Sequence, residues 1–320
     1  RDYVARVRAA LGPEVPLTFM QSNGGLAAAG HFTGKNAILS GPAGGAVACA
    51  ALGAAAEQPR LIGFDMGGTS TDVCRIDGAP ELRYEQAVAG VRIKAPMTWI
   101  ETVAAGGGSL LQFDGLRPSV GPESAGAYPG PTCYGHGGPL AITDANLVLG
   151  RIQPRYFPAC FGADANQPLD AEAAHAAMAA RAAEVNEATG SRYTAESLAA
   201  GYVRIANETM AQPIKEVSVG RGYDVQEYAL CCFGGAGAQH ACALAETLGM
   251  RAIVLHPLAG VLSAHGIGLA RLRQDATEAL LTPLEAARPQ LDTRFAAMET
   301  ANTEALRAQG ATGALEHARP

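Results

Sequence analysis

The sequence predicts an α/β protein in which a mixed sheet is flanked by helices. Two short apolar runs, at 61–64 and 228–233, have the length of buried strands. Segments with apolar residues at helical spacing lie between and after them, and the longest extends from about 194 to 219. Strands that alternate with helices in this way are typical of α/β folds.

The first sixty residues predict two helices around one strand. Ser40 can cap the second helix, and Pro42 suits its first turn. A glycine-proline pair follows the first helix and ends it. The predicted elements are a helix over 1–11, a strand over 15–20, a polar turn QSNGGL at 21–26, and a helix over 40–56.

The remaining chain predicts a hairpin, two glycine turns and four further helices, one of which follows the second glycine turn at 230–240. Asp170 is a suitable cap for one helix, and Pro213 should kink or interrupt the next. Pro289 suits the first turn of the last helix. The predicted elements are a hairpin at 61–77, a strand at 91–100, a glycine turn at 104–110, an aperiodic loop at 121–146, helices at 170–188, 194–219 and 289–309, and strands at 228–233 and 253–255.

The hairpin string GFDMGGTSTDV at 63–73 is the most informative segment. Glycines at its tip let backbone N–H groups approach an anion closely, and hydroxyl side chains add donors. A carboxylate beside such a tip can hold hydrated Mg²⁺ or orient a water molecule. The string therefore predicts a phosphate-binding turn rather than an ordinary glycine hairpin. The predicted binding residues are Gly67, Gly68, Thr69, Ser70 and Thr71, with Asp65 and Asp72 as catalytic carboxylates and Asp65 also as a metal ligand.

A second glycine turn, LCCFGGAGAQH at 230–240, joins a buried strand to a helix. Bare backbone at Gly234, Gly235 and Gly237 suits a flat ligand, and a helix N-terminus favours phosphate oxygens. His240 lies in the first turn of that helix, where the dipole favours neutral imidazole. We expect a catalytic role for His240, with packing or capping as the alternative.

The loop at 121–146 carries several polar residues between glycines and prolines. Long loops inside compact domains are usually functional or disordered, and this one has few free charges, which favours an ordered loop. His136 and Asp144 are candidate metal ligands or acid–base groups, and hydrogen-bonded structural roles are the alternative. No His/Cys spacing of a known metal site supports the metal interpretation.

Composition restricts the class of partner and the compartment. The net charge of −6 without a basic run argues against nucleic acid and against an anionic membrane surface. Seven scattered cysteines without a CxxC pair fit reduced thiols in a cytoplasm. The chain begins inside a helical pattern, so we expect it to be a piece of a longer protein.

Several strings together resemble the hydantoinase A / 5-oxoprolinase family, within the superfamily of actin, hexokinase and heat-shock ATPases. GFDMGGTSTDV and FGGAG resemble the second phosphate motif and the adenosine motif of the superfamily. QSNGGL, LSGPAGGAV, the string GPESAGAYPGPTCYGHGGPLAITDANLVLGRI at 121–152 and GVLSAHGIGLA at 260–270 resemble the family. The resemblance covers residues 15 to about 275.

The resemblance implies an actin-like (ribonuclease H-like) ATPase domain with a loop-rich insertion. The expected parts are the end of a preceding lobe with a connecting helix at 1–60, a second ATPase lobe at 61–275, and a helical segment at 276–320 that is cut short. Another Asp-Gly-Gly-Thr hairpin is expected upstream, so this piece alone should be inactive. QSNGGL and the 121–146 loop are candidates for the substrate side or for a subunit contact.

The resemblance also implies ATP and Mg²⁺ as cofactors and a small cyclic amide, such as 5-oxoproline or a hydantoin, as the substrate. Phosphorylation of the amide oxygen would activate the ring for hydrolysis. A B-type subunit or region and an oligomer are expected. Two alternatives stay open: a subunit of an ATP-dependent ketone carboxylase of the acetone or acetophenone type, and a nucleotide-switched, actin-like binding protein.

Overall fold

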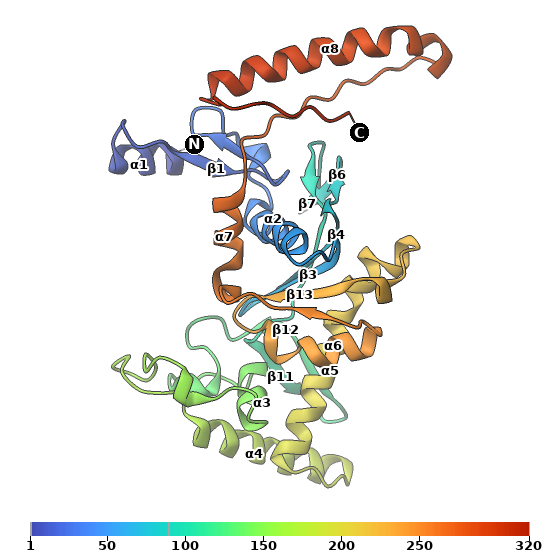
Figure 1. Ribbon diagram of the computed structural model, residues 1–320. Coiled ribbons are helices and arrows are strands. Elements are labelled where there is room, and N and C mark those ends of the chain that lie inside the picture. Colours follow the sequence, from blue (N-terminus) through green and yellow to red (C-terminus); the bar gives the residue numbers. More distant parts are fainter. Residues whose placement is uncertain (1, 89, 320) are drawn as a thin grey trace. The chain divides into compact units, whose positions relative to one another are not determined.

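The computed structural model describes residues 2–88 and 90–319, and these form two compact units (Figure 1). The first unit comprises the described residues within 1–48, 82–98 and 263–320, and the second comprises 49–81 and 99–262. Among the helices that the structure describes, none combines the length and the apolar character that crossing a membrane requires.

Six strands form the central sheet of the second unit. They are β3 (Arg60–Met66), β4 (Thr71–Asp77), β5 (Ala79–Pro80), β10 (Ile100–Val103), β13 (Ala229–Phe233) and β14 (Ile253–Val254). Their order is β10-β4-β3-β13-β14, with β5 paired to β4. The ladders β10–β4 and β4–β3 are antiparallel, whereas β13 is parallel to both β3 and β14. This mixed sheet, with helices packed against it, confirms the predicted α/β fold class.

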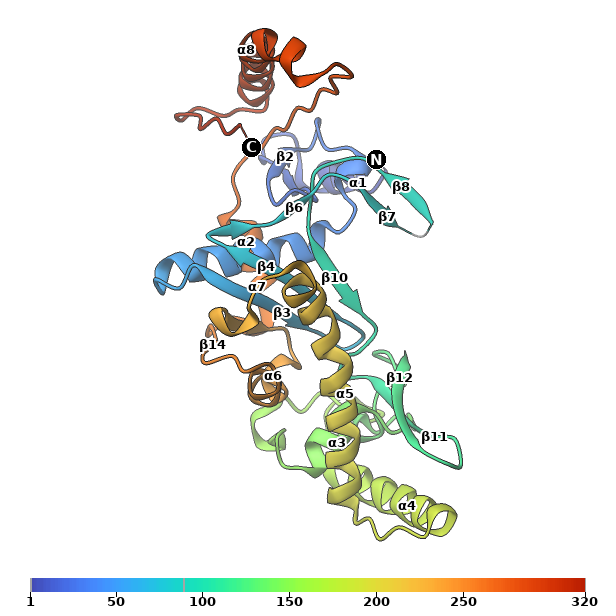
Figure 2. The same ribbon diagram turned by 90° about the vertical axis from the view of Figure 1, so that its right-hand side faces the viewer.

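Helices cover both faces of this sheet (Figure 2). Ile62, Phe64 and Met66 alternate along β3 and join one core cluster with residues of α5 (Ala195–Val217) and α6 (Ala241–Leu248). On the opposite face, a Cβ added to Gly63 would lie 3.2 Å from the Sγ of Cys49, in the C-terminal part of α2 (Ser40–Ala55). The period-two alternation of the strand therefore assigns successive residues to different helices.

A helical and hairpin segment lies between β10 and α5 in the chain. It contains the antiparallel hairpin of β11 (Ser109–Phe113) and β12 (Pro118–Ser124), and the helices α3 (Ile142–Val148) and α4 (Ala171–Thr189). Ala145 of α3, Met178 of α4 and Tyr202 of α5 are fully buried in the same core cluster. The Tyr202 hydroxyl donates to the Gln112 carbonyl oxygen at 2.9 Å, which ties the hairpin to α5.

The structure corrects the prediction of an aperiodic loop at 121–146. The first residues of that range finish β12, the middle forms the 3₁₀ turn η2 (Thr132–Tyr134), and the last begin α3. Pro and Gly in β12 are tolerated because it pairs only with β11. The other short 3₁₀ turns of the second unit are η3 (Pro154–Tyr156), η4 (Val219–Arg221), η5 (Val225–Glu227), η6 (Gly237–Gln239) and η7 (Ala259–Val261).

The first unit consists of short hairpins and helices. Its elements are α1 (Asp2–Leu11), β1 (Thr18–Met20), β2 (Leu26–Ala28), η1 (Gly34–Asn36), the N-terminal part of α2, β6 (Leu82–Arg83), β7 (Gln86–Val88), β8 (Val91–Ile93), β9 (Met97–Thr98), α7 (Leu262–Leu269) and α8 (Leu284–Ala308). The pairs β1–β2, β6–β9 and β7–β8 are antiparallel. Leu26 also bridges Leu272 in parallel, so the segment after α7 runs beside β2.

The predicted cap at Asp170 was confirmed, and the predicted position of Pro289 in the first turn of its helix was wrong. Asp170 accepts from the backbone N–H of Ala173 and caps its helix as predicted. Thr194, for which no cap was predicted, accepts from the backbone N–H of Ser197 and caps α5. Pro213 does not interrupt α5. Pro289 lies inside α8, which begins at Leu284, five residues before the proline and therefore beyond the reach of its first turn. The predicted strand at 91–100 is divided among β8, β9 and β10.

Candidate nucleotide site

The β3–β4 hairpin places two carboxylates opposite one another. Asp65 and Asp72 are directly paired in the antiparallel ladder, so their side chains lie on the same face of the sheet. Both residues are partly buried. Directly opposed side chains have Cβ atoms about 4.5–5.5 Å apart, a spacing at which two carboxylates can share one cation.

The tip of the hairpin exposes a row of backbone donors. The Gly67 N–H donates to the Ser70 carbonyl oxygen at 3.1 Å and closes the turn. In the part of the chain that the structure describes, the N–H groups of Gly68, Thr69 and Ser70 have no backbone or side-chain acceptor. A Cβ on Gly68 would meet no atom within 4 Å. Consecutive free N–H groups on an open turn are suited to bind an anion.

A further glycine turn, residues 106–108, packs against this tip. The Gly107 N–H donates to the Gly67 carbonyl oxygen at 3.0 Å. A Cβ on Gly106 would lie 2.7 Å from the carbonyl carbon of Gly68, so a larger residue there would displace the tip. The sequence shows this turn, but no local signal connects it with the hairpin. Its role in supporting the anion-binding tip was therefore missed.

The second predicted glycine motif lies beside the first. β13 runs parallel to β3 with Phe233 opposite Asp65, so Gly234 follows at the carboxyl end of both strands. A Cβ on Gly234 would lie 2.4 Å from the Met66 carbonyl oxygen and 2.5 Å from the Asp65 Oδ1. Ligands of open α/β sheets bind at the carboxyl ends of the strands. The fold thus brings the two motifs together at the expected edge.

The three glycines of this motif have different surroundings. Gly234 has φ +83°, and its missing side chain permits the close approach to β3. Gly235 is exposed, and a Cβ there would meet nothing within 4 Å. Gly237 is buried, and a Cβ there would lie 2.8 Å from the Sγ of Cys232. Gly235 offers open backbone to a ligand, whereas Gly237 has a packing role.

Thr71 differs from the expectation for the hydroxyl residues. Its side chain is fully buried, and its hydroxyl donates to the Ala105 carbonyl oxygen at 2.6 Å. Thr71 pairs with Met66, on the opposite face of the hairpin from the Asp65–Asp72 pair. The Thr71 hydroxyl is therefore committed to the fold, and Thr69 and Ser70 are the hydroxyl residues at the tip.

Asp72 is in an environment that disfavours its charge. Burial raises the pKa of the Asp72 carboxyl, and the hydrogen bond from Thr102 partly opposes this effect. The Thr102 hydroxyl donates to the Asp72 Oδ1 at 2.5 Å. A bound cation would stabilise the ionised form of this carboxyl.

His240 is a buried structural residue in this arrangement. It is fully buried, its Nδ1 lies 2.6 Å from the Asn207 Oδ1, and its Nε2 lies 3.0 Å from the Asn146 Nδ2. Burial, assisted by the positive charge of Arg151, lowers the pKa of His240 to about 4. The neutral ring donates from Nδ1 to Asn207 and accepts at Nε2 from Asn146. The packing alternative therefore describes His240, and the expectation of a catalytic role is corrected.

Asp144 and His136 do not form a metal centre. Both Asp144 oxygens accept backbone N–H groups, from Cys133 at 2.8 Å and from Ala141 at 2.8 Å. Burial raises the pKa of Asp144, and these donors oppose the shift. His136 lies beside the Tyr128 ring, with centroids 5.3 Å apart. Within residues 2–88 and 90–319, no cluster of three or more His, Cys, Asp or Glu side chains is placed to hold a metal ion.

Comparisons with known proteins identify the family. The family model described as Hydantoinase/oxoprolinase matches residues 1–276. The chain belongs to the hydantoinase/oxoprolinase family. This family member is 50% identical to 5-oxoprolinase 1 of Arabidopsis thaliana over 273 residues, which are 83% of this chain and 22% of the plant protein. It is 36% identical to caprolactamase subunit alpha of Pseudomonas jessenii over 324 residues, which cover 97% of this chain and 44% of that subunit.

Solved structures extend the likeness to the fold. The crystal structure of ATP-dependent caprolactamase from Pseudomonas jessenii matches with a TM-score of 0.79 and 33% identity, covering 98% of this chain and 45% of that chain. A nucleotide-free acetone carboxylase matches with a TM-score of 0.75 and 24% identity, covering 97% of this chain and 44% of that one. The family member thus spans about a fifth of the first curated relatives and under half of these structures.

Proposed function

We propose that the whole protein to which this chain belongs opens a cyclic amide at the expense of ATP. The observation that carries the proposal is the meeting of the hairpin tip and the Gly234 turn beside the Asp65–Asp72 pair. Free N–H groups, open backbone and two carboxylates at one sheet edge are the components that a magnesium nucleotide requires. ATP supplies a phosphoryl group that activates the amide oxygen.

The residues of this chain have separate roles in the proposal. The N–H groups of Gly68, Thr69 and Ser70 bind phosphate oxygens, and open backbone at Gly235 receives the nucleoside end. Asp65 and Asp72 hold Mg²⁺, which commonly uses one or two carboxylates together with phosphates and water. Catalysis of phosphoryl transfer consists mainly of positioning and charge neutralisation, for which rigid backbone donors are suited.

The substrate class and the partner follow from the relatives. Proteins named 5-oxoprolinase and caprolactamase support a cyclic amide, and the name "subunit alpha" supports a B-type partner subunit. The lobe boundaries near residues 60 and 275, an upstream lobe and an oligomer belong to the same proposal. A cytoplasmic location is also proposed, because all seven cysteines are unpaired thiols.

The test uses the full-length protein with its B-type partner. ATP hydrolysis is measured with 5-oxoproline, with hydantoin, and with acetone plus bicarbonate, together with the organic product of each. Ring-opened product in proportion to the ADP formed supports the proposal. Stimulation by acetone and bicarbonate alone would instead identify a ketone carboxylase. ATP turnover that no small molecule changes would identify a nucleotide-switched binding protein.

A further inference from the structure

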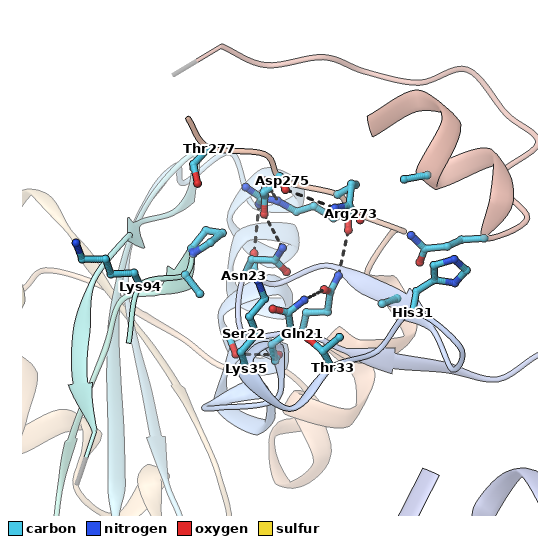
Figure 3. A pocket seen from close by; sticks show the side chains of 17 residues that line it. Gln21, Ser22, Asn23, His31, Thr33, Lys35, Lys94, Arg273, Asp275 and Thr277 are labelled. Carbon is cyan, nitrogen blue, oxygen red and sulfur yellow. Dashed lines mark hydrogen bonds and ion pairs between the residues drawn. The ribbon is translucent and has the colours of Figure 1, made fainter. Parts of the chain in front are cut away.

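The first unit contains a polar cavity of about 400 Å³, and no residue of the hairpin or of its glycine turns is among the lining residues (Figure 3). Four segments far apart in the sequence line it, at 21–36, 94–96, 273–277 and 305–309. The first of these begins with the QSNGGL string. The volume falls in the range of roughly 300–1,000 Å³ that is usual for small-molecule sites.

The floor of the cavity is a preorganised network of buried polar side chains. Gln21, Ser22 and Asn23 are 4%, 1% and 7% exposed. The Asn23 Nδ2 donates to the Asp275 Oδ2 at 2.6 Å, and the Asn23 Oδ1 accepts from the Gly25 N–H at 2.9 Å. Burying polar groups is costly unless they are hydrogen-bonded, and this network satisfies them with fixed geometry.

Arg273 is held in this network by some of its guanidinium N–H groups, and the others are left for a ligand. Its Nε donates to the Asp275 Oδ1 at 3.0 Å, and its Nη1 donates to the Asn23 carbonyl oxygen at 3.2 Å. Figure 3 shows these three side chains directed toward one another. Three of the five guanidinium N–H donors have no acceptor in the described part of the chain. A guanidinium held in a fixed orientation is preorganised to bind the carboxylate of a ligand.

The cavity carries an excess of positive charge. The chain has three lysines among its 24 basic residues, and two of them, Lys35 and Lys94, line this cavity. Both lysines are exposed, and Lys94 also acts electrostatically on Glu85, which does not line the cavity. Among the described lining residues, Asp275 supplies the one carboxylate, and it is already bound by Arg273 and Asn23. Three cations against one anion favour an anionic ligand.

We propose that this cavity binds the carboxylate of a small acidic lactam, with Arg273, Lys35 and Lys94 as the residues that select for the acid. The proposal rests on the proposed function and names the charge class of its substrate. 5-Oxoproline carries both an amide and a carboxylate, whereas 2-pyrrolidinone has the same ring without the acid. The amide and hydroxyl side chains of the cavity suit the ring amide, and the cations suit the carboxylate.

Direct titration tests this inference without any turnover. Calorimetry measures binding of 5-oxoproline, and of its uncharged amide 5-oxoprolinamide, to the full-length protein without ATP. In a Lys35→Met/Lys94→Met double variant we expect the Kd for 5-oxoproline to rise about tenfold, the combined effect of two exposed charge contacts. The Kd for 5-oxoprolinamide should change far less. Lys215→Met is the matched control, because it removes the remaining lysine, which is exposed on α5.

A second variant tests the guanidinium. Arg273→Lys keeps the charge and loses the forked donors, so it should also weaken 5-oxoproline binding, with folding checked by thermal unfolding. The inference is overturned if the wild-type protein does not bind 5-oxoproline, or if the double variant binds it as tightly as the wild type. If binding behaves as expected but no lactam is opened with ATP, the proposed function fails and the acid-binding site stands.

Discussion

Asp65 and Asp72 are paired residues of one antiparallel ladder, and both belong to the end of the sheet where Gly234 approaches. Like charges directly opposite each other destabilise a sheet. Burial also raises the pKa of Asp72, which shows that its charge is poorly solvated. A carboxyl group kept where burial disfavours its charge is typical of a site whose function requires that charge.

Replacing a carboxylate of this pair should lower the activity without lowering the stability of the fold. Asp72→Asn removes a charge that burial disfavours and should raise the free energy of unfolding by about 0.2–1 kcal/mol. The same change should lower ATP-dependent turnover of the full-length protein at least about a hundredfold, because a charge-stabilising group is lost. Denaturant unfolding and a coupled ATPase assay measure the two effects. Asp65→Asn should lower the turnover to a similar extent.

Asp164→Asn is the control for this pair, because Asp164 is exposed in the same unit and its side chain forms no hydrogen bond or ion pair with the described residues. It should change neither quantity. Wild-type turnover in Asp65→Asn would show that this residue is not part of the site.

The addition of Mg²⁺ should raise the unfolding temperature of the wild-type protein, since a ligand that binds the folded state stabilises it. The rise should be absent in Asp65→Asn.

Local patterns predicted the elements of the site, but not every residue's role. The hairpin and the Gly234 turn were predicted because each is a strand followed by glycines, and their meeting follows from the parallel pairing of β13 with β3. The burial of Thr71 could have been predicted as well. Asp65 and Asp72 share one face, so alternation places Thr71 on the other.

Other roles depend on contacts between distant segments and had no local signal. His240 is buried because Asn207 of α5 and Asn146 of α3 enclose it, and neither is near it in sequence. Asp144 resembles a metal ligand in sequence, yet the backbone of 132–133 folds back onto its carboxylate. The support of the tip by residues 106–108 has the same origin.

Gly106→Ala should disturb the tip of the hairpin. The new Cβ would lie 2.7 Å from the backbone of Gly68 and Thr69, which cannot move aside cheaply. We expect a loss of about 1–3 kcal/mol in the free energy of unfolding and a nucleotide Kd at least about tenfold weaker. Gly201→Ala is the control, because its Cβ meets nothing on α5 and should add about 0.5–1 kcal/mol of stability. Unchanged nucleotide binding in Gly106→Ala would contradict this role of the turn.

Thr71→Val should lower the stability of the fold, whereas Thr69→Val should lower the affinity for nucleotide. Thr71→Val leaves the buried Ala105 carbonyl without its donor and should cost about 1–3 kcal/mol of stability, with nucleotide affinity little changed. Thr69→Val alters an exposed tip residue and should leave stability unchanged while nucleotide affinity falls. Chemical denaturation measures the stability of both variants, and nucleotide titration measures their affinity. Equal effects of the two variants on affinity would return Thr71 to the binding site.

His240 should give the protein a specific dependence of stability on pH. Its pKa is about 4 in the folded protein against an ordinary value of 6.5, so between these values the unfolded chain binds a proton that the folded protein does not. Stability is therefore lost as the pH falls from about 6.5 to about 4, by about 3 kcal/mol, with no further loss from this group below. At pH 7 the contribution is fully present.

His240→Gln isolates that contribution from the titrating carboxylates. The variant keeps a polar side chain but cannot titrate, and loss of buried hydrogen bonds should cost about 1–3 kcal/mol at pH 7. The difference in unfolding free energy between wild type and variant should shrink as the pH falls from 7 to 4. A difference that is constant over this range would mean that the ring is protonated in the folded state or exposed to water. Persistent lactam-dependent ATP turnover in the variant at pH 8 would agree with its structural role, because the neutral ring serves only to join α3, α5 and α6.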